Sequence, residues 1–250
     1  MRRTSLGRRS VVLAALATTT AVTACGGARD RGRAPARTPS AGEQPLRSRA
    51  EVVHQWGRVT SWLGEHAPAT HARLRPPVTA EALARFERIA GGPVHEDLAA
   101  WWSLNEGTYL FTLPAFLDGY APLGVDGSLR CRPQADAEES GWERSWVPFA
   151  CNDPTDPYSG LFHDARTGFV GHWAEADMPA LWQGMTLAGY LKRQADALHR
   201  PGGRPAPGRD VPGVWNGHLV WDDPAARLRD ELEGWRPVHR EHVGDREEPR

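Results

Sequence analysis

The sequence predicts an α+β fold in which helices precede an antiparallel sheet and one further helix closes the domain. Apolar residues recur at helical spacing in residues 50–105 and again after Thr186. Between these stretches, short apolar runs alternate with turns rich in Gly, Pro, Asn and Asp. Eleven tryptophans among 250 residues can anchor a core, which excludes wholesale disorder. Helices, then strands, then a helix are typical of α+β domains.

Three helices are expected at the start of the domain. Residues 50–66 place their valine, leucine and tryptophan side chains on one helical stripe. Thr79 is suited to cap a second helix, which the glycine pair beginning at Gly91 ends. A third helix follows Pro93 and ends near Asn105.

Strand-like runs follow, and they predict an antiparallel sheet of about five to six strands. The polar stretch 118–141 is expected to be a long surface loop. The expected strands are residues 109–113, 146–150, 160–163 and 169–173.

The C-terminal quarter is expected to hold a closing helix, a linker and a short appendage. Thr186 is suited to cap the closing helix, and residues 201–210 have the composition of a Pro/Gly/Arg linker. Val214–Trp221 is expected to form one more strand, and Asp223 to cap a last helix before a disordered tail. The sequence leaves open whether residues 211–250 complete the domain.

The first 24 residues have the pattern of an export signal. Four arginines among residues 2–9 precede the uncharged run Val11–Ala24. That run is shorter than the roughly 20 apolar residues that span a bilayer, and it matches the apolar region of a signal peptide. Small residues before Cys25 resemble a bacterial lipobox, in which the cysteine is acylated after cleavage. The sequence therefore predicts an exported protein anchored at the outer face of the cell membrane through a lipid on Cys25. The Arg8–Arg9 pair resembles a twin-arginine signal, and the export route stays open.

Charge is segregated along the chain. Residues 1–24 and residues 25–49 each carry +4, so the net charge of −1 leaves −9 on residues 50–250. An acidic body repels phosphates, which argues against a nucleic-acid binder. The acidity either keeps the surface soluble or suits a basic protein partner. Residues 25–49 have almost no large apolar side chain and are expected to be a disordered tether.

Cys131 and Cys151 are the two cysteines that remain once Cys25 is acylated. Outside the cytoplasm such a pair tends to oxidise, so a disulfide is expected, with two separate buried thiols as the alternative.

The search for catalytic motifs predicts no enzyme, cofactor or resident metal. HExxH, P-loop, GxGxxG and GxSxG patterns are all absent from the sequence. The triplet His95–Glu96–Asp97 is expected to serve a helix N-terminus. His163, Asp164 and His172 fall near two expected strands and offer a minimal zinc or iron site, although a strand-end coincidence is favoured.

Trp142, Trp146 and Trp173 are either core residues or a platform on which sugars stack. Core packing explains tryptophans more often, but eleven exceed what one core needs.

Three stretches in order resemble the SUKH superfamily, which groups fungal Smi/Knr-type cell-wall regulators with bacterial toxin-immunity proteins. Leu74–Gly107 resembles its N-terminal signature of two helices joined by a glycine turn. Trp146–Ala150 resembles a "W-x-P-[FI]-A" strand, and Gly160–Asp164 follows it as the family expects. Leu187–Leu191 resembles the closing "F-x-x-Y-L" helix, with Leu187 in place of the aromatic residue. The likeness covers about residues 50–200.

The chain departs from the family pattern at the second helix. Val94 and His95 stand where the family usually has Leu-Pro, and Glu106 interrupts its Asn-Gly pair. The resemblance implies a non-enzymatic α+β binding module.

We therefore expect a surface-tethered protein-binding module. Its role would be immunity or inhibition against a basic toxin, or a part in an envelope complex. The alternatives are a cell-wall or glycan-binding lipoprotein and a metal-dependent hydrolase. The candidates for partner binding are Glu106, Asp118, Asp126, Trp142, Asp153 and Asp156.

Overall fold

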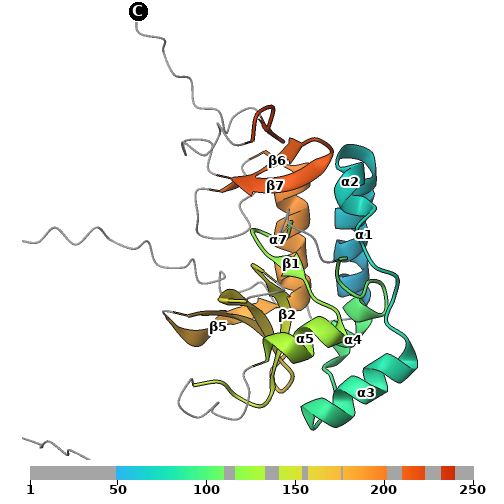
Figure 1. Cartoon of the computed structure of the whole chain (residues 1–250), viewed down its shortest axis with the longest axis vertical. Coiled ribbons are helices and arrows are strands. Elements are labelled where there is room, and N and C mark those ends of the chain that lie inside the picture. Colours follow the sequence, from blue (N-terminus) through green and yellow to red (C-terminus); the bar gives the residue numbers. More distant parts are fainter. Residues whose placement is uncertain are drawn as a thin grey trace, which may run out of the picture. The chain divides into compact units, whose positions relative to one another are not determined.

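The computed structural model describes residues 49–109, 116–132, 141–153, 157–175, 177–201, 210–222 and 232–239. All of them belong to one structural unit. The unit combines helices with an antiparallel sheet of five strands and a second sheet of three, so the predicted α+β class is confirmed (Figure 1).

The helices expected from the sequence form, and the predicted threonine and glycine residues cap two of them. The Thr79 side chain accepts a hydrogen bond from the Ala82 amide, and Gly91 ends the same helix at a φ of 82°. Thr186 caps the closing helix by accepting from the Gly189 amide. Within the described residues the helices are α1 (Arg49–His66), α2 (Pro68–His71), α3 (Ala80–Ala90), α4 (Glu96–Trp102), α5 (Val125–Cys131) and α7 (Leu187–His199).

The five-stranded sheet follows the order of the chain. Every neighbouring pair is antiparallel, and the registers of β2–β3 and β4–β5 shift at irregularities. Three expected strands are confirmed, as β2, β3 and β4. The strands are β1 (Ala121–Pro122), β2 (Trp146–Cys151), β3 (Ser159–Asp164), β4 (Phe169–Ala174) and β5 (Asp177–Thr186).

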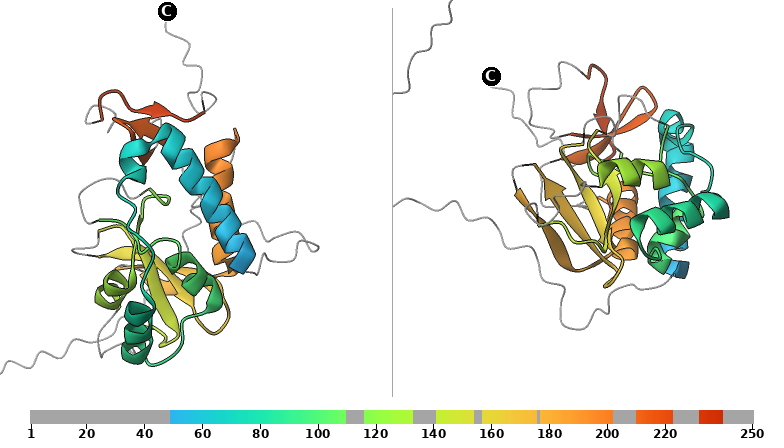
Figure 2. Two further views of the ribbon diagram at one scale, coloured as in Figure 1. Left: turned by 90° about the vertical axis from the view of Figure 1, so that its right-hand side faces the viewer. Right: turned by 60° about the horizontal axis from the view of Figure 1, so that its bottom comes forward.

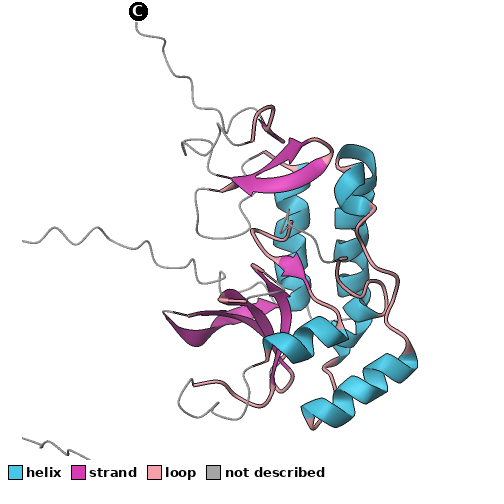
Figure 3. Ribbon diagram, viewed as in Figure 1, coloured by secondary structure: helices cyan, strands magenta, loops and turns pink. Residues whose placement is uncertain are grey.

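Helices α4, α5 and α7 contact this sheet, whereas α2 packs against β7 (His218–Asp222) of the second sheet and α3 against α5 (Figure 3). α1 packs along α7 and α4, and α7 contacts β4 and β5 (Figure 2). Trp101 of α4 lies in this core, where its ring meets Trp56 and Phe149 edge to face. Centroid separations of 5.3 and 5.6 Å show that α1, α4 and β2 close on one another through these rings.

Two expectations about secondary structure are wrong. The stretch 118–141 is not one surface loop, because β1 and the largely buried helix α5 lie within it. Val214–Trp221 is not one strand, because Asn216 and Gly217 form a turn with positive φ. This turn joins β6 (Val211–Trp215) to β7 (His218–Asp222), and β8 (Arg236–Pro237) pairs with β6.

The β6–β7 hairpin belongs to the same core as the rest of the unit. The Leu219 amide donates to Thr70 Oγ1 at 2.9 Å, and Trp221 Nε1 donates to the Phe116 carbonyl at 2.7 Å. Leu219 and Trp221 are both buried in the main core. The hairpin therefore completes the domain instead of standing apart from it.

Several expectations fall wholly or mainly outside the described residues. They concern the export signal with Cys25, the tether, the strand over 109–113 and the helix after Asp223. Among the residues that the structure describes, no helix is long and apolar enough to cross a membrane.

Candidate functional site

Of the six residues expected to bind a partner, the five that the structure describes do not gather on one surface. Glu106 pairs with Arg75 at 3.1 Å, and its backbone amide donates to Pro76. Asp126 is exposed on α5 and pairs with Arg85 of α3. Both carboxylates therefore join segments of the fold, and Asp156 lies outside the described residues.

Trp142, which was expected to contact a partner, is buried. Its side chain is 6% exposed and packs on the outer face of the sheet, the face turned away from α1 and α7. It meets Trp146, Phe162 and Trp173 at centroid distances of 5.6, 5.2 and 5.7 Å. A side chain that is 6% exposed presents little ring surface on which a sugar could stack.

Asp153 lies in a different setting, at an exposed end of the sheet. The ends of β2, β3, β4 and β5 meet here. The Asn152 amide donates to Ser159, and the Glu175 amide donates to the Tyr158 carbonyl at 2.8 Å. Ala174 and Asp177 are paired across β4 and β5. We call the surface made by Asp153, Tyr158, Glu175, Asp177 and Met178 the strand-end surface.

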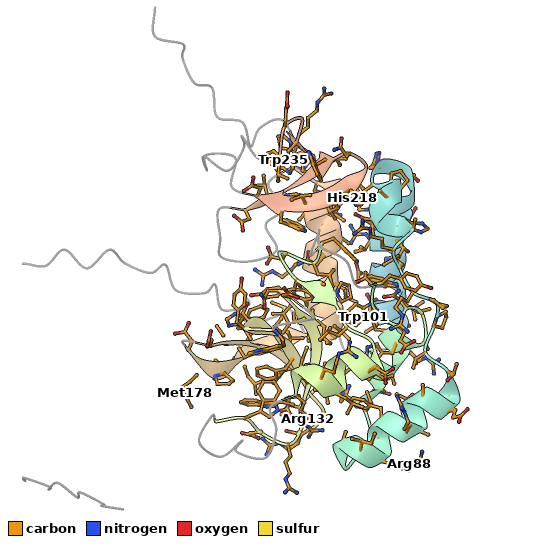
Figure 4. The ribbon with its side chains drawn as sticks, viewed as in Figure 1. Arg88, Trp101, Arg132, Met178, His218 and Trp235 are labelled. Carbon is orange, nitrogen blue, oxygen red and sulfur yellow. The ribbon has the colours of Figure 1, made fainter. Side chains whose placement is uncertain are left out.

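The strand-end surface combines exposed apolar side chains with carboxylates. Tyr158 is 59% exposed and Met178 is 69% exposed, the highest value among the large apolar side chains that the structure describes. Figure 4 labels Met178 near the free end of β5, away from the helices. Asp153, Glu175 and Asp177 are exposed beside them. Exposed aromatic and methionine side chains of this kind are enriched at protein interfaces.

The expected disulfide between Cys131 and Cys151 is absent, because both residues are free, buried thiols. They are nevertheless side by side in a small cluster with Leu123. Hydrogen bonding between the thiols lowers the pKa of Cys131 and raises the pKa of Cys151. Helix α5, which the sequence did not predict, ends at Cys131 and brings it to the end of β2.

The metal set that His163, Asp164 and His172 offered as an alternative does not form. The Asp164 carboxylate turns into the β3–β4 turn, where it accepts from the Arg166 amide and the Thr167 hydroxyl. The His172 ring lies against Tyr120 and Trp182. His163 pairs with Val170 in the sheet, and its side chain does not meet those of Asp164 and His172.

His163 instead meets the two side chains that were expected only to serve a helix N-terminus. His95 immediately precedes α4, and Asp97 lies in its first turn. An imidazole nitrogen of each histidine and a carboxylate oxygen of Asp97 all lie within 4.8 Å of one another. The two imidazole centroids are 4.9 Å apart. This His95–Asp97–His163 cluster joins α4 to β3.

Burial controls the chemistry of this cluster. His163 is fully buried, and burial together with the neighbouring His95 lowers its pKa to about 3. Neither ring nitrogen of His163 has a hydrogen-bond partner among the described residues. Asp97 is also buried, whereas His95 is half-buried and accepts from the Asp97 amide through Nδ1 at 3.2 Å.

Asp118 lies in a second polar cluster. Its φ of 55° is in the left-handed region, and burial, then the charge of Asp210, raises its pKa to about 7. Arg193 opposes that rise. Tyr190, fully buried beside it, donates to the Leu117 carbonyl at 3.1 Å. The half-buried Asp118 is thus part of the packing beneath α7, not an open acidic surface.

Sequence reasoning missed the meeting of His95 and His163 because 67 positions separate them. Alternation along β3 was a usable signal, since it places His163 on the same face as the core residue Leu161. The position of α4 against that face is a matter of tertiary packing, which alternation does not specify. In comparisons with known proteins, no family model and no curated protein matches the chain.

Proposed function

We propose that this protein is a binding module for a basic protein partner, and that the strand-end surface is where the partner docks. The observation that carries the proposal is the conjunction of highly exposed Tyr158 and Met178 with the carboxylates of Asp153, Glu175 and Asp177. Buried tyrosine and methionine supply binding energy at an interface, and carboxylates at its rim steer a basic partner.

The net charge of −9 on residues 50–250 supports the same partner. Long-range attraction raises the rate at which an oppositely charged protein is met, and salt weakens it. We expect side-chain contacts and not strand addition. Pro179 offers no amide to a partner strand, and the register of β5 shifts against β4.

The predicted export signal and the lipobox-like position of Cys25 support a location outside the cytoplasm, tethered by lipid. The resemblance to SUKH proteins supports a non-enzymatic role, as an inhibitor of a toxin or as a component of an envelope assembly. A toxin met there would have to act on the envelope, because a nuclease kills in the cytoplasm.

The docking surface is tested by affinity purification of the full chain from its own envelope after cross-linking. The original chain is compared with Tyr158→Ala/Met178→Ala and with Glu175→Gln/Asp177→Asn. We expect one basic protein in stoichiometric amount. The first variant should weaken binding by at least about tenfold, as for interface anchors. The second should reduce the dependence of binding on salt.

Matched controls lie on α3. Ile89→Ala removes a side chain that is 61% exposed, and Glu81→Gln removes an exposed charge. Neither should change recovery of the partner. Equal losses in the α3 variants, or capture of wall fragments in place of a protein, would contradict the proposed docking surface. Separately, Cys25→Ser should move the chain from the membrane fraction to the soluble fraction.

A further inference from the structure

We propose that His95, Asp97 and His163 bind one zinc ion, with a fourth position open to water or an external ligand. Two histidines and one carboxylate form a ligand set that zinc takes in sites with an open position. This cluster lies between α4 and β3 and shares no residue with the strand-end surface.

The position of His163 is the strongest support for this site. A fully buried imidazole normally has a hydrogen-bond partner for each nitrogen, because an unpartnered buried polar atom is costly. Neither nitrogen of His163 finds one among the described residues. Its ring lies beside that of His95, with the two centroids 4.9 Å apart and the rings tilted by 49°.

The distances are compatible with a metal after a small closure. A tetrahedral zinc site with Zn–N bonds of about 2.0–2.1 Å holds its ligand atoms roughly 3.3 Å apart. The three ligand atoms here lie within 4.8 Å of one another, so the widest pair has to close by about 1.5 Å at most. His95 is half-buried and can supply that movement, and its exposed part offers an entry path.

Metal binding should break the hydrogen bond by which His95 caps α4. A neutral imidazole has one donor nitrogen and one acceptor nitrogen, and His95 Nδ1 now accepts from the Asp97 amide. If Nδ1 binds the metal, its lone pair is used. If Nε2 binds it, Nδ1 carries the proton and no longer accepts. In both cases the Asp97 amide loses this acceptor, and its hydrogen exchange should become faster when zinc is bound.

The test is a zinc titration of the full chain, without a histidine tag, against a competing chelating dye. Thiols also bind zinc, so the titration is repeated with Cys25, Cys131 and Cys151 replaced by serine. We expect one zinc ion per chain in both proteins. We also expect a rise in Tm of about 5–10 °C at a hundredfold excess of zinc over Kd. Cobalt in place of zinc should show the visible absorption of a tetrahedral site.

Variants assign the ligands. His163→Gln, Asp97→Asn and His95→Gln should each weaken zinc binding by at least about 10–100-fold, the loss that follows removal of groups merely supporting a metal ligand. His172→Gln is the matched control, because His172 lies on the next strand with its ring against Tyr120 and Trp182. It should leave zinc affinity unchanged.

Three results would overturn the site. They are the loss of zinc binding in the serine protein, equal weakening by His172→Gln, and undiminished binding in the three ligand variants. If His163→Gln does not fold, as near-ultraviolet circular dichroism would show, Asp97→Asn and the half-buried His95→Gln still decide the question.

Discussion

Two tight turns in this molecule share a backbone form and differ in chemistry. At Asp118–Gly119 and at Asn216–Gly217 both residues have positive φ, as a two-residue hairpin turn of type I′ requires. Asn216 is exposed, whereas Asp118 is half-buried with a pKa raised to about 7. Either residue type satisfies such a turn. The backbone therefore does not require the charge of Asp118, and the surroundings decide what that charge costs.

The surroundings of Asp118 make its charged form unfavourable. Burial contributes most, and the Asp210 carboxylate adds to it against the attraction of Arg193. Burial also raises the pKa values of the neighbouring Tyr120 and Tyr190, so both phenol groups stay neutral beside Asp118.

Removing the carboxylate should have the largest effect. The pKa of Asp118 is higher in the folded protein, about 7, than its ordinary value of 3.8. Below about pH 4 both states are protonated and Asp118 costs nothing. Between pH 4 and 7 the unfolded state loses its proton first, so the folded state loses stability. Asp118→Asn should therefore increase the free energy of unfolding above pH 7 by up to ~4 kcal/mol and change little near pH 4.

The measurement is denaturant unfolding of both proteins at pH 4, 6 and 8. Asparagine keeps the left-handed φ at little cost, so the turn itself should survive. A gain that is the same at all three pH values would contradict the raised pKa and point to a packing change.

Replacing the glycines should affect both turns to a similar and smaller extent. Gly119 and Gly217 have φ values of 86° and 76°, at which an alanine costs about 1–2 kcal/mol. A Cβ at Gly119 would meet no atom within 4 Å, and one at Gly217 would lie 3.4 Å from Ala69 Cβ. Gly119→Ala and Gly217→Ala should both lower Tm, with no dependence on pH. A loss in only one of them would show that the two turns differ in backbone form.

These turns also show which features can be predicted from local sequence patterns and which cannot. Asp-Gly and Asn-Gly are strong local hairpin signals, so both turns were predictable, yet they were assigned to a loop and to the middle of a strand. The caps at Thr79 and Thr186 were predicted correctly because a cap depends on adjacent residues. The pKa of Asp118 and the meeting of His95 with His163 depend on packing between distant segments, which local patterns do not specify.

Neutralising Asp210 should have a smaller effect than replacing Asp118. Burial is the main cause of the raised pKa, and the Asp210 charge is the second. Asp210→Asn should therefore lower the pKa of Asp118 only part of the way toward 3.8, and it should stabilise the protein at pH 8 by about 0.2–1 kcal/mol. Titration of the Asp118 carboxyl carbon by NMR measures this directly. An unchanged midpoint would show that Asp210 is too well screened to act.

The smallest effect is expected from placing a carboxylate in the other turn. Asn216→Asp creates the Asp-Gly pair found at 118–119, but at an exposed position where water solvates the charge. The free energy of unfolding should change by less than about 0.5 kcal/mol at any pH between 4 and 8. If the Asn216→Asp variant instead lost stability as pH rose, the turn geometry alone would raise the pKa of the introduced carboxylate. The raised pKa of Asp118 would then be explained by its turn, without its burial or its neighbours. If the free energy of unfolding does not depend on pH for Asn216→Asp but does depend on pH through Asp118, a carboxylate in this turn has no effect on stability when it is exposed. Beneath α7 the same carboxylate lowers stability.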